Sequence, residues 1–397
     1  MFNKIFSNYF SNYFNNNRNI LERSGIQSDL ISYKTVNTKS SFSYNDLSNT
    51  GYKKNVIVFR CITLIARAIS SVDWILKSIK GNTDVDEIIY KHKILDIINK
   101  PNALYSKNSF IEEAISYLLL DGNCYIAVVR DSSNSPKEFY ILRPDRVRII
   151  PGSDTIPKGY EYTVGQNSRF FPVDNDTGNS DVLHIKLFNP MDDWYGMSPI
   201  EVSMSSIQQH NAIALQNTSF LQNGGRPSGA LMYKHSIDSQ KRNELKHDLK
   251  TLYEGGRNAG KILLLEGDFQ WKEMGLSPKD LDFTAGKEMS AKEIALAFGV
   301  PPILIGIMSS ATFSNYKEAR YNFWEETVIP LLNIFTDSLS NWIKQIFNTD
   351  LKLEYDLDSI PALSKRRETE WKKINEASFL TDDEKRAAVG YTSISES

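Results

Sequence analysis

Cysteine is nearly absent from this chain of 397 residues, which contains only Cys61 and Cys124. The two lie far apart and form no Cys-x-x-Cys pair, so the sequence disfavours a disulfide framework and a zinc site and fits a reducing compartment. The few histidines show no ligand spacing such as His-Glu-x-x-His. The sequence therefore predicts no metal site and no cofactor. The histidines are His92, His184, His210, His235 and His247.

An excess of positive charge is also lacking, because 46 Lys and Arg stand against 48 Asp and Glu. This balance excludes a generally basic DNA binder that gains affinity by neutralising phosphates, although it allows a protein past which DNA slides. No apolar run approaches the roughly 18 residues that cross a bilayer. The first residues lack the apolar core and cleavage site of a signal peptide. The sequence therefore predicts a folded protein with no membrane partner.

Catalytic patterns are missing as well. Gly196-Met197-Ser198 lacks the final glycine of a nucleophile elbow. Asp192 and Asp193 have no partner at catalytic spacing and are expected to be solvated. Without a constellation of acid, base and nucleophile, the sequence predicts no catalytic residue and no enzyme.

One stretch does match a chemical motif. "EGGRNAGKILLLEG" contains G-x-x-x-x-G-K at residues 255–261, the start of a nucleotide-binding P-loop. A working P-loop follows a strand and opens a helix, whose free amides hold the phosphates. Here a helical pattern precedes the glycines and the strand "KILLL" follows them, and Ile262 stands where Ser or Thr would hold magnesium. The stretch is better explained as a helix end, a turn and a strand. An ATPase with a degenerate P-loop remains the alternative.

What is present indicates an α+β fold. Residues 1–54 are rich in Asn, Ser and Tyr without a sustained period, which predicts a flexible arm. Over residues 55–197, helical spacing in "NVIVFRCITLIARAISSVDW" alternates with short runs such as "CYIAVVR" and "DVLHIKLF" between turn residues. This pattern predicts antiparallel sheets beside helices.

A helix of unusual composition is predicted over residues 198–222. It starts with the N-cap Ser198, Pro199 in the first turn and a capping-box Glu201, and it ends at Gly224. Glu201 is its only formal charge, whereas a lone surface helix carries a charged face. Such a helix suits packing among copies of itself, and burial inside one subunit explains it equally well.

Taken in chain order, several segments resemble the portal proteins of tailed bacteriophages, in the branch common in long-tailed phages, prophages and gene-transfer particles. The resemblance covers roughly residues 55 to 391. The matching segments are "PNALYSKNSF", "LLLDGNCYIAVVR", "LRPDRVRI", "DVLHIKLFNPMDDWYGMSPIE", "FLQNGGRPSGAL", "GRNAGKILLLEGDFQWKEMGLSPKDLDF", "EIALAFGVPPILIG", "ATFSNYKEARYNFWEETVIPLL" and "FLTDDEKRAAVG".

The resemblance implies a structural ring of about twelve copies around a channel at one capsid vertex. Through this channel the terminase packages DNA, which is later ejected, and to the ring the head-completion and tail proteins attach. The implied partners are the terminase large subunit, the major capsid protein, a head-completion or adaptor protein, and double-stranded DNA bound without sequence preference. The implied location is the virion, and the bacterial host cytoplasm during assembly. A monomeric surface-associated binding protein that uses the Asn/Tyr-rich arm is a further alternative.

The resemblance also assigns parts to the chain. A channel loop of hydroxyl and amide side chains, with no Lys or Arg, would let DNA move, because tight phosphate neutralisation would stall it; a plain surface loop is the alternative. The implied tunnel-loop residues are Ser309, Ser310, Thr312, Ser314 and Asn315, and the implied terminase or connector contacts are Arg257, Asn258 and Lys261. The implied divisions are an arm (1–54), a wing (55–197), a stem helix (198–224), a clip (225–276), a second stem helix (277–299), a tunnel-loop region (300–316), a long helix kinked at Pro330 with a wing strand (317–358) and crown helices (359–397).

Overall fold

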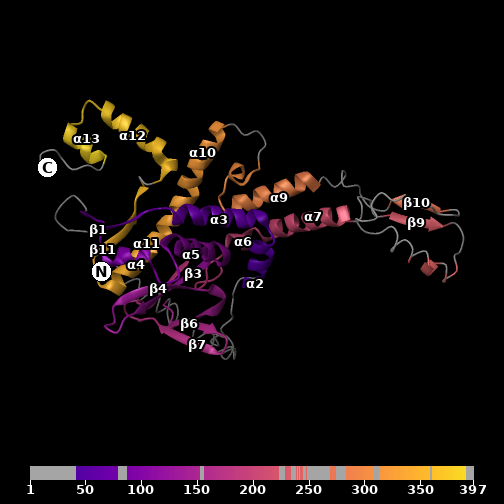
Figure 1. The fold of residues 1–397 in the computed structure, drawn as a ribbon, viewed down its shortest axis with the longest axis horizontal. Coiled ribbons are helices and arrows are strands. Elements are labelled where there is room, and N and C mark those ends of the chain that lie inside the picture. The colour runs from indigo at the N-terminus through magenta and orange to yellow at the C-terminus, as the bar shows by residue number, and fades with distance from the viewer. Residues whose placement is uncertain are drawn as a thin grey trace, which may run out of the picture. The chain divides into compact units, whose positions relative to one another are not determined.

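The fold is built from helices and small antiparallel sheets that alternate along the chain (Figure 1). The chain divides into two units, residues 1–41 and 42–397, and everything described below belongs to the second. The computed structural model describes residues 42–78, 87–152, 156–222, 229–233, 238, 240, 242–244, 247, 269–273, 283–307, 313–357 and 360–389. The α+β class predicted from the sequence is confirmed.

The helices and strands are, in chain order, α2 (Tyr44–Asp46), the π-helix η1 (Leu47–Lys53), α3 (Val56–Ser70), β1 (Trp74–Ser78), β2 (Glu87–Ile89), α4 (Lys93–Asn99), α5 (Lys107–Asp121), β3 (Asn123–Arg130), β4 (Pro136–Leu142), η2 (Pro144–Arg146), β5 (Val147–Ile150), β6 (Gly159–Val164), β7 (Asn167–Pro172), β8 (Val182–Lys186), α6 (Pro199–Val202), α7 (Met204–Gln222), β9 (Gly229–Tyr233), β10 (Phe269–Glu273), α9 (Phe283–Ala297), η4 (Pro302–Ile305), α10 (Phe313–Phe323), the π-helix η5 (Trp324–Val328), α11 (Ile329–Phe347), β11 (Leu351–Tyr355), η7 (Pro361–Leu363), α12 (Ser364–Glu376) and α13 (Asp382–Ala388).

The first described helices correct one sequence prediction. Residues 42–54, predicted as the end of a flexible arm, form α2 and η1, and Leu47 and Gly51 of η1 are buried. A Cβ atom at Gly51 would lie 2.7 Å from Cγ2 of Ile200, so η1 packs closely against α6. Short polar residues such as Asn and Ser favour caps and turns over helix interiors, so the sequence of this segment does not predict a helix. Packing against the rest of the fold stabilises the helical conformation.

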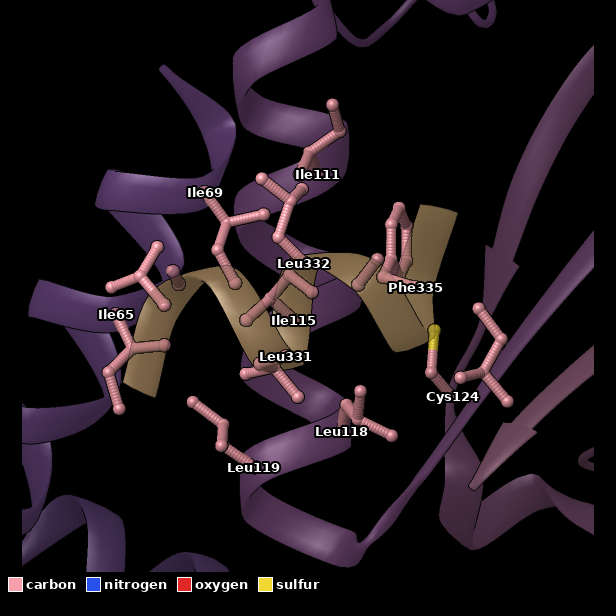
Figure 2. Packing of buried hydrophobic residues seen from close by; sticks show 14 of the residues in the cluster. Ile65, Ile69, Ile111, Ile115, Leu118, Leu119, Cys124, Leu331, Leu332 and Phe335 are labelled. Atoms are coloured by element: carbon pink, nitrogen blue, oxygen red, sulfur yellow. The ribbon is translucent and has the colours of Figure 1, made fainter. Parts of the chain in front are cut away.

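The main hydrophobic core lies among α3, α5, α11 and the start of β3 (Figure 2). One face of α3 is buried, as its helical spacing of apolar residues predicts, and includes Val58, Ile62, Ile65 and Ile69. Asn55 caps the start of α3, and Gly122, at a φ of 80°, ends α5. Figure 2 labels the core residues Ile65, Ile69, Ile111, Ile115, Leu118, Leu119, Cys124, Leu331, Leu332 and Phe335.

Two antiparallel sheets border this core, and a third encloses a second, smaller hydrophobic cluster with residues of β3. β3 is central between β4 and β8, β1 is central between β11 and β2, and β5, β6 and β7 form a meander. The pairing of β1 with β11 joins residues near the two ends of the described chain, with Leu76 opposite Leu353. A fourth sheet pairs β9 with β10 and is a described part of the segment 225–276.

The helical path from α10 to α11 is continuous but not uniform. A π-helical turn, η5, separates the two α-helices, and Pro330 lies in the first turn of α11. Proline has no amide hydrogen to donate, and its ring clashes with the carbonyl four residues earlier, here that of Glu326. The interruption that the sequence predicts at this proline therefore takes the form of a π turn.

Candidate functional site

The predicted helix over 198–222 is two helices. α6 starts at the buried Ser198, whose Oγ accepts a hydrogen bond from the Ile200 amide and donates one to the carbonyl oxygen of Leu119. α6 ends at Ser203, where the side-chain hydroxyl bonds to the Pro199 carbonyl at 2.8 Å, and α7 then begins. A serine hydroxyl that bonds to a carbonyl of its own helix in this way slightly destabilises the helix and often bends it. Ser198 therefore ties the start of this helical segment to α5.

α7 has no charged side chain and is mostly uncovered in the chain. Its buried residues, Met204, Ile207 and His210, all lie in its first half, whereas Leu215 and Leu221 in its second half are exposed. The alternative that burial inside one subunit explains the missing charge therefore fails for the second half of α7.

α9 lies beside α7. Ser206 donates a hydrogen bond of 2.6 Å to Glu293, and a Cβ at Gly286 would lie 3.5 Å from Cδ1 of Ile213, so the two helices approach closely. α9 is followed by Gly299, at a φ of 66°, ahead of Val300 and two prolines. The two helices assigned by resemblance to the stem therefore pack as a pair.

A buried cluster of amide and imidazole groups joins α7 to the start of α3. The side-chain nitrogen of Asn55 lies 3.2 Å from Nδ1 of His210 and 3.0 Å from Oδ1 of Asn211. Asn211 in turn donates to the carbonyl oxygen of Thr50 in η1. Burial, and secondarily the positive charge of Lys287, lowers the pKa of His210 below its usual value. This cluster is not apparent from the sequence, because only the N-cap role of Asn55 leaves a local signal.

The residues assigned by resemblance to the channel are described only in part. Ser314 and Asn315 lie exposed in the first turn of α10. The remaining channel and clip residues, Ser309, Ser310, Thr312, Arg257, Asn258 and Lys261, lie outside the described residues, as does the P-loop-like stretch 255–261. Of the sequence-predicted site residues, the structure therefore describes only the neighbours Ser314 and Asn315.

Two cysteine thiols and one imidazole among the described residues have pKa values that burial shifts away from their ordinary range. Burial raises the pKa of the Cys61 thiol to about 12 and that of the Cys124 thiol above its ordinary value, so both are protonated at neutral pH and are poor nucleophiles. Burial lowers the pKa of His184 to about 3. Within the described part of the chain, no group of three or more His, Cys, Asp or Glu residues could hold a metal ion, and no helix is long and apolar enough to span a bilayer.

The chain belongs to the phage portal protein family, whose sequence model matches residues 56–390. The predicted resemblance is thereby confirmed over nearly the same span. An uncharacterized protein of Rickettsia bellii (strain RML369-C) is 41% identical over 347 residues, which cover 86% of this chain and 88% of that protein. The portal protein of Enterobacteria phage HK97 is 22% identical over 308 residues, 76% of this chain and 70% of that protein. In a solved structure of the neck of a native gene transfer agent particle with C12 symmetry, a chain matches at a TM-score of 0.69 and 36% identity, over 90% of this chain and 95% of that one.

Proposed function

We propose that this protein is the portal subunit of a phage or phage-like particle, and that copies of it form a ring at one capsid vertex. The observation that carries the proposal is the 36% identity, over 90% of this chain, to a chain from a particle neck with C12 symmetry. DNA passes inward through the ring during packaging by the terminase and outward on ejection. Head-completion and tail proteins attach to the same ring, and the major capsid protein surrounds it. The protein acts in the virion, after assembly in the bacterial host cytoplasm.

The exposed half of α7 supports assembly into a ring. A ring is a closed head-to-tail assembly, so each copy covers part of the next. Leu215 and Leu221 on α7, and Met289 and Leu296 on α9, are large apolar side chains that are exposed in one copy. Burying apolar surface of this kind contributes about 25 cal/mol per Å². An uncharged helix adds no cost of charge desolvation when copies come together.

The assignment of parts remains as the resemblance implies. In this proposal α6 with α7, and α9, are the stem, the β9–β10 segment belongs to the clip, α10 to α11 form the long interrupted helix, and α12 and α13 lie in the crown. Arg257, Asn258 and Lys261 of the clip contact the terminase or the connector. The loop that contains Ser309, Ser310 and Thr312, together with Ser314 and Asn315, faces the DNA. The ring has no enzymatic activity of its own, and the motor supplies the ATP hydrolysis.

Imaging of the purified full-length chain tests the proposal. Negative-stain micrographs and native mass spectra should show a ring with a central hole, and a persistent monomer at high concentration would overturn it. The double variant Leu215→Glu/Leu221→Glu should remain folded and fail to form rings, because it places charge at the two exposed leucines of α7. Val164→Glu, which adds one such carboxylate at an exposed apolar residue of β6, is the control and should still form rings.

ATP hydrolysis decides the enzymatic alternative. The wild-type chain should show no turnover above a blank, and Lys261→Ala should leave that result unchanged. Turnover that the substitution abolishes would establish the P-loop at 255–261 and replace the present proposal.

A further inference from the structure

The loop after β8 holds two large apolar side chains out in solvent. Phe188 is 83% exposed and Met191 is 86% exposed. Single exposed apolar residues are ordinary on a protein surface, but two of this size within one short loop form a small protruding apolar surface. Residues 188–193 are called the apolar loop below. Its last two residues, Asp192 and Asp193, add carboxylates beside the apolar side chains.

The apolar loop is fixed by hydrogen bonds along its length. The amide of Met191 donates to Oδ1 of Asn189 at 2.9 Å, and the Asn189 side chain donates to the carbonyl oxygen of Tyr195. Oδ1 of Asp192 accepts from the amides of Trp194 and Tyr195. Lys186 donates to the Asp193 carbonyl oxygen. A loop held in this way has already lost most of its conformational entropy, so a partner that covers it has little ordering cost to offset.

A groove of about 670 Å³ lies where η1 meets α3. Its apolar lining comes from Tyr52, Val56 and Phe59, with the rings of Tyr52 and Phe59 5.2 Å apart. Val56 and Phe59 are 67% and 46% exposed, so the described part of the chain leaves this apolar lining open. Two exposed lysines, Lys53 and Lys54, also line it.

The apolar loop and the groove complement each other in two respects. The loop offers projecting apolar side chains beside carboxylates, and the groove offers a recessed apolar surface beside two ammonium groups. The high exposure of Phe188 and Met191 shows that the loop does not occupy the groove of its own chain. Two different, complementary surfaces on one chain are what a head-to-tail contact between identical copies requires, and repetition of that contact closes a ring.

We infer that the apolar loop of one copy inserts Phe188 and Met191 into the groove of the next copy, with Asp193 facing Lys53 and Lys54. The inference rests on the proposed ring and names a contact within it. Burial of the apolar side chains supplies the affinity. The pairing of Asp193 with the lysines selects which surfaces meet, because arrangements that bring like charges together are disfavoured. An ion pair at the rim adds little binding energy of its own.

A cysteine cross-link tests this contact directly. Cys61 and Cys124 are buried, so cysteines introduced by Met191→Cys and Val56→Cys are the reactive ones. Mild oxidation of the double variant should give a ladder of disulfide-linked oligomers on a non-reducing gel, because a disulfide needs Cα atoms within roughly 7 Å. A mixture of the two single variants should stop at dimers. The matched control pairs Met191→Cys with Val164→Cys, an exposed position outside the groove, and should give no ladder.

A charge exchange provides a second readout. Asp193→Lys should weaken association of the copies about tenfold, as measured by the concentration at which rings dissociate, because it places three ammonium groups together. Lys54→Asp in the same chain should restore most of the loss. If rings form, the oxidised double cysteine variant gives no ladder, and the charge substitutions leave the dissociation concentration unchanged, this inference is wrong and the proposed function stands. A chain that forms no ring at any concentration would overturn both.

Discussion

Asn55 and His210 form a buried contact between residues 155 positions apart, with the Asn55 amide nitrogen 3.2 Å from Nδ1 of the imidazole. The orientation of the asparagine follows from its cap, because its Oδ1 accepts hydrogen bonds from the amides of Ile57 and Val58. Its NH₂ group therefore points to His210 and donates to Nδ1. The imidazole must then be neutral, with its proton on Nε2. This agrees with the lowered pKa of His210.

The first prediction concerns the stability of this contact. Asn55→Ala removes the cap of α3 and leaves the buried Nδ1 of His210 and the part-buried Oδ1 of Asn211 without their donor. Loss of a cap costs about 1 kcal/mol and an unsatisfied buried group about 1–3 kcal/mol, so unfolding free energy should fall by about 3 kcal/mol. Urea denaturation measures the change. Asn45→Ala, in the exposed helix α2, is the control and should shift the urea midpoint little; an equal shift would contradict the assigned role of Asn55.

Asn55→Asp should act differently, and this difference makes a second prediction. The aspartate still accepts from the amides of Ile57 and Val58, so it keeps the cap, but it presents an oxygen to His210 in place of the NH₂ group. A carboxylate beside an imidazole favours the protonated ring, so the pKa of His210 should rise. The imidazole ¹H–¹⁵N signals in NMR titrations of both proteins measure that pKa. An unchanged pKa would mean that the Asn55 side chain does not face the ring.

The third prediction concerns His184, whose pKa burial lowers from 6.5 to about 3. Its ring stacks on Tyr125 at 4.4 Å, and Nε2 lies 3.0 Å from Oδ1 of Asn123. Between pH 6.5 and 3 the unfolded chain binds a proton at this residue and the folded chain does not. Stability from this group is therefore fully present above pH 6.5 and is lost as the pH falls, by up to about 1.4 kcal/mol per pH unit.

His184→Phe tests this pH dependence, because it keeps an aromatic ring on Tyr125 and removes the titration. The variant should be less stable at pH 7, where the bond to Asn123 is lost, and its unfolding free energy should fall less steeply between pH 6.5 and 4. Urea denaturation at each pH gives the two slopes, and their difference cancels the contribution of carboxylates common to both proteins. Parallel slopes would show that His184 is protonated in the folded chain.

The fourth prediction uses a matched pair of glycines. Gly122 and Gly165 both have positive φ, at 80° and 61°. A Cβ at Gly122 would lie 2.6 Å from the backbone carbonyl carbon of Gly196, whereas a Cβ at Gly165 would meet nothing within 4 Å. Gly165→Ala should cost only the left-handed strain, about 1–2 kcal/mol. Gly122→Ala adds a backbone clash and should cost at least about twice as much, as thermal or urea unfolding will measure. Equal losses would mean that the backbone at Gly196 moves away freely.

The sequence was informative wherever structure follows from local pattern. The apolar period of α3, the Ser198 cap of α6 and the proline near the start of α11 each have a nearby physical cause, and each prediction agrees with the structure. Contacts between distant residues left no such signal. η1 packs against α6 where Gly51 lets Ile200 approach, and Asn55 meets His210 only after α3 and α7 are packed. From the sequence, the apolar loop is recognisable only as a loop that carries two carboxylates. The exposure of Phe188 and Met191 follows from the conformation of the loop, which the hydrogen bond from Asn189 to the Tyr195 carbonyl oxygen helps to hold.

The last prediction concerns the proposed channel loop. Residues 309–315 include no Lys or Arg, so in that proposal their contacts with passing DNA are weak. Ser310→Lys would place a positive charge on every copy in the ring and attract phosphates along the DNA. Packaging in vitro should become slower, and added salt should restore part of the rate, because the new attraction is screened over about 10 Å at 0.1 M. Ser310→Asn, a polar replacement without charge, should leave both the rate and its salt dependence near those of the wild type. If Ser310→Lys packages DNA at the wild-type rate at every salt concentration, residue 310 does not face the channel.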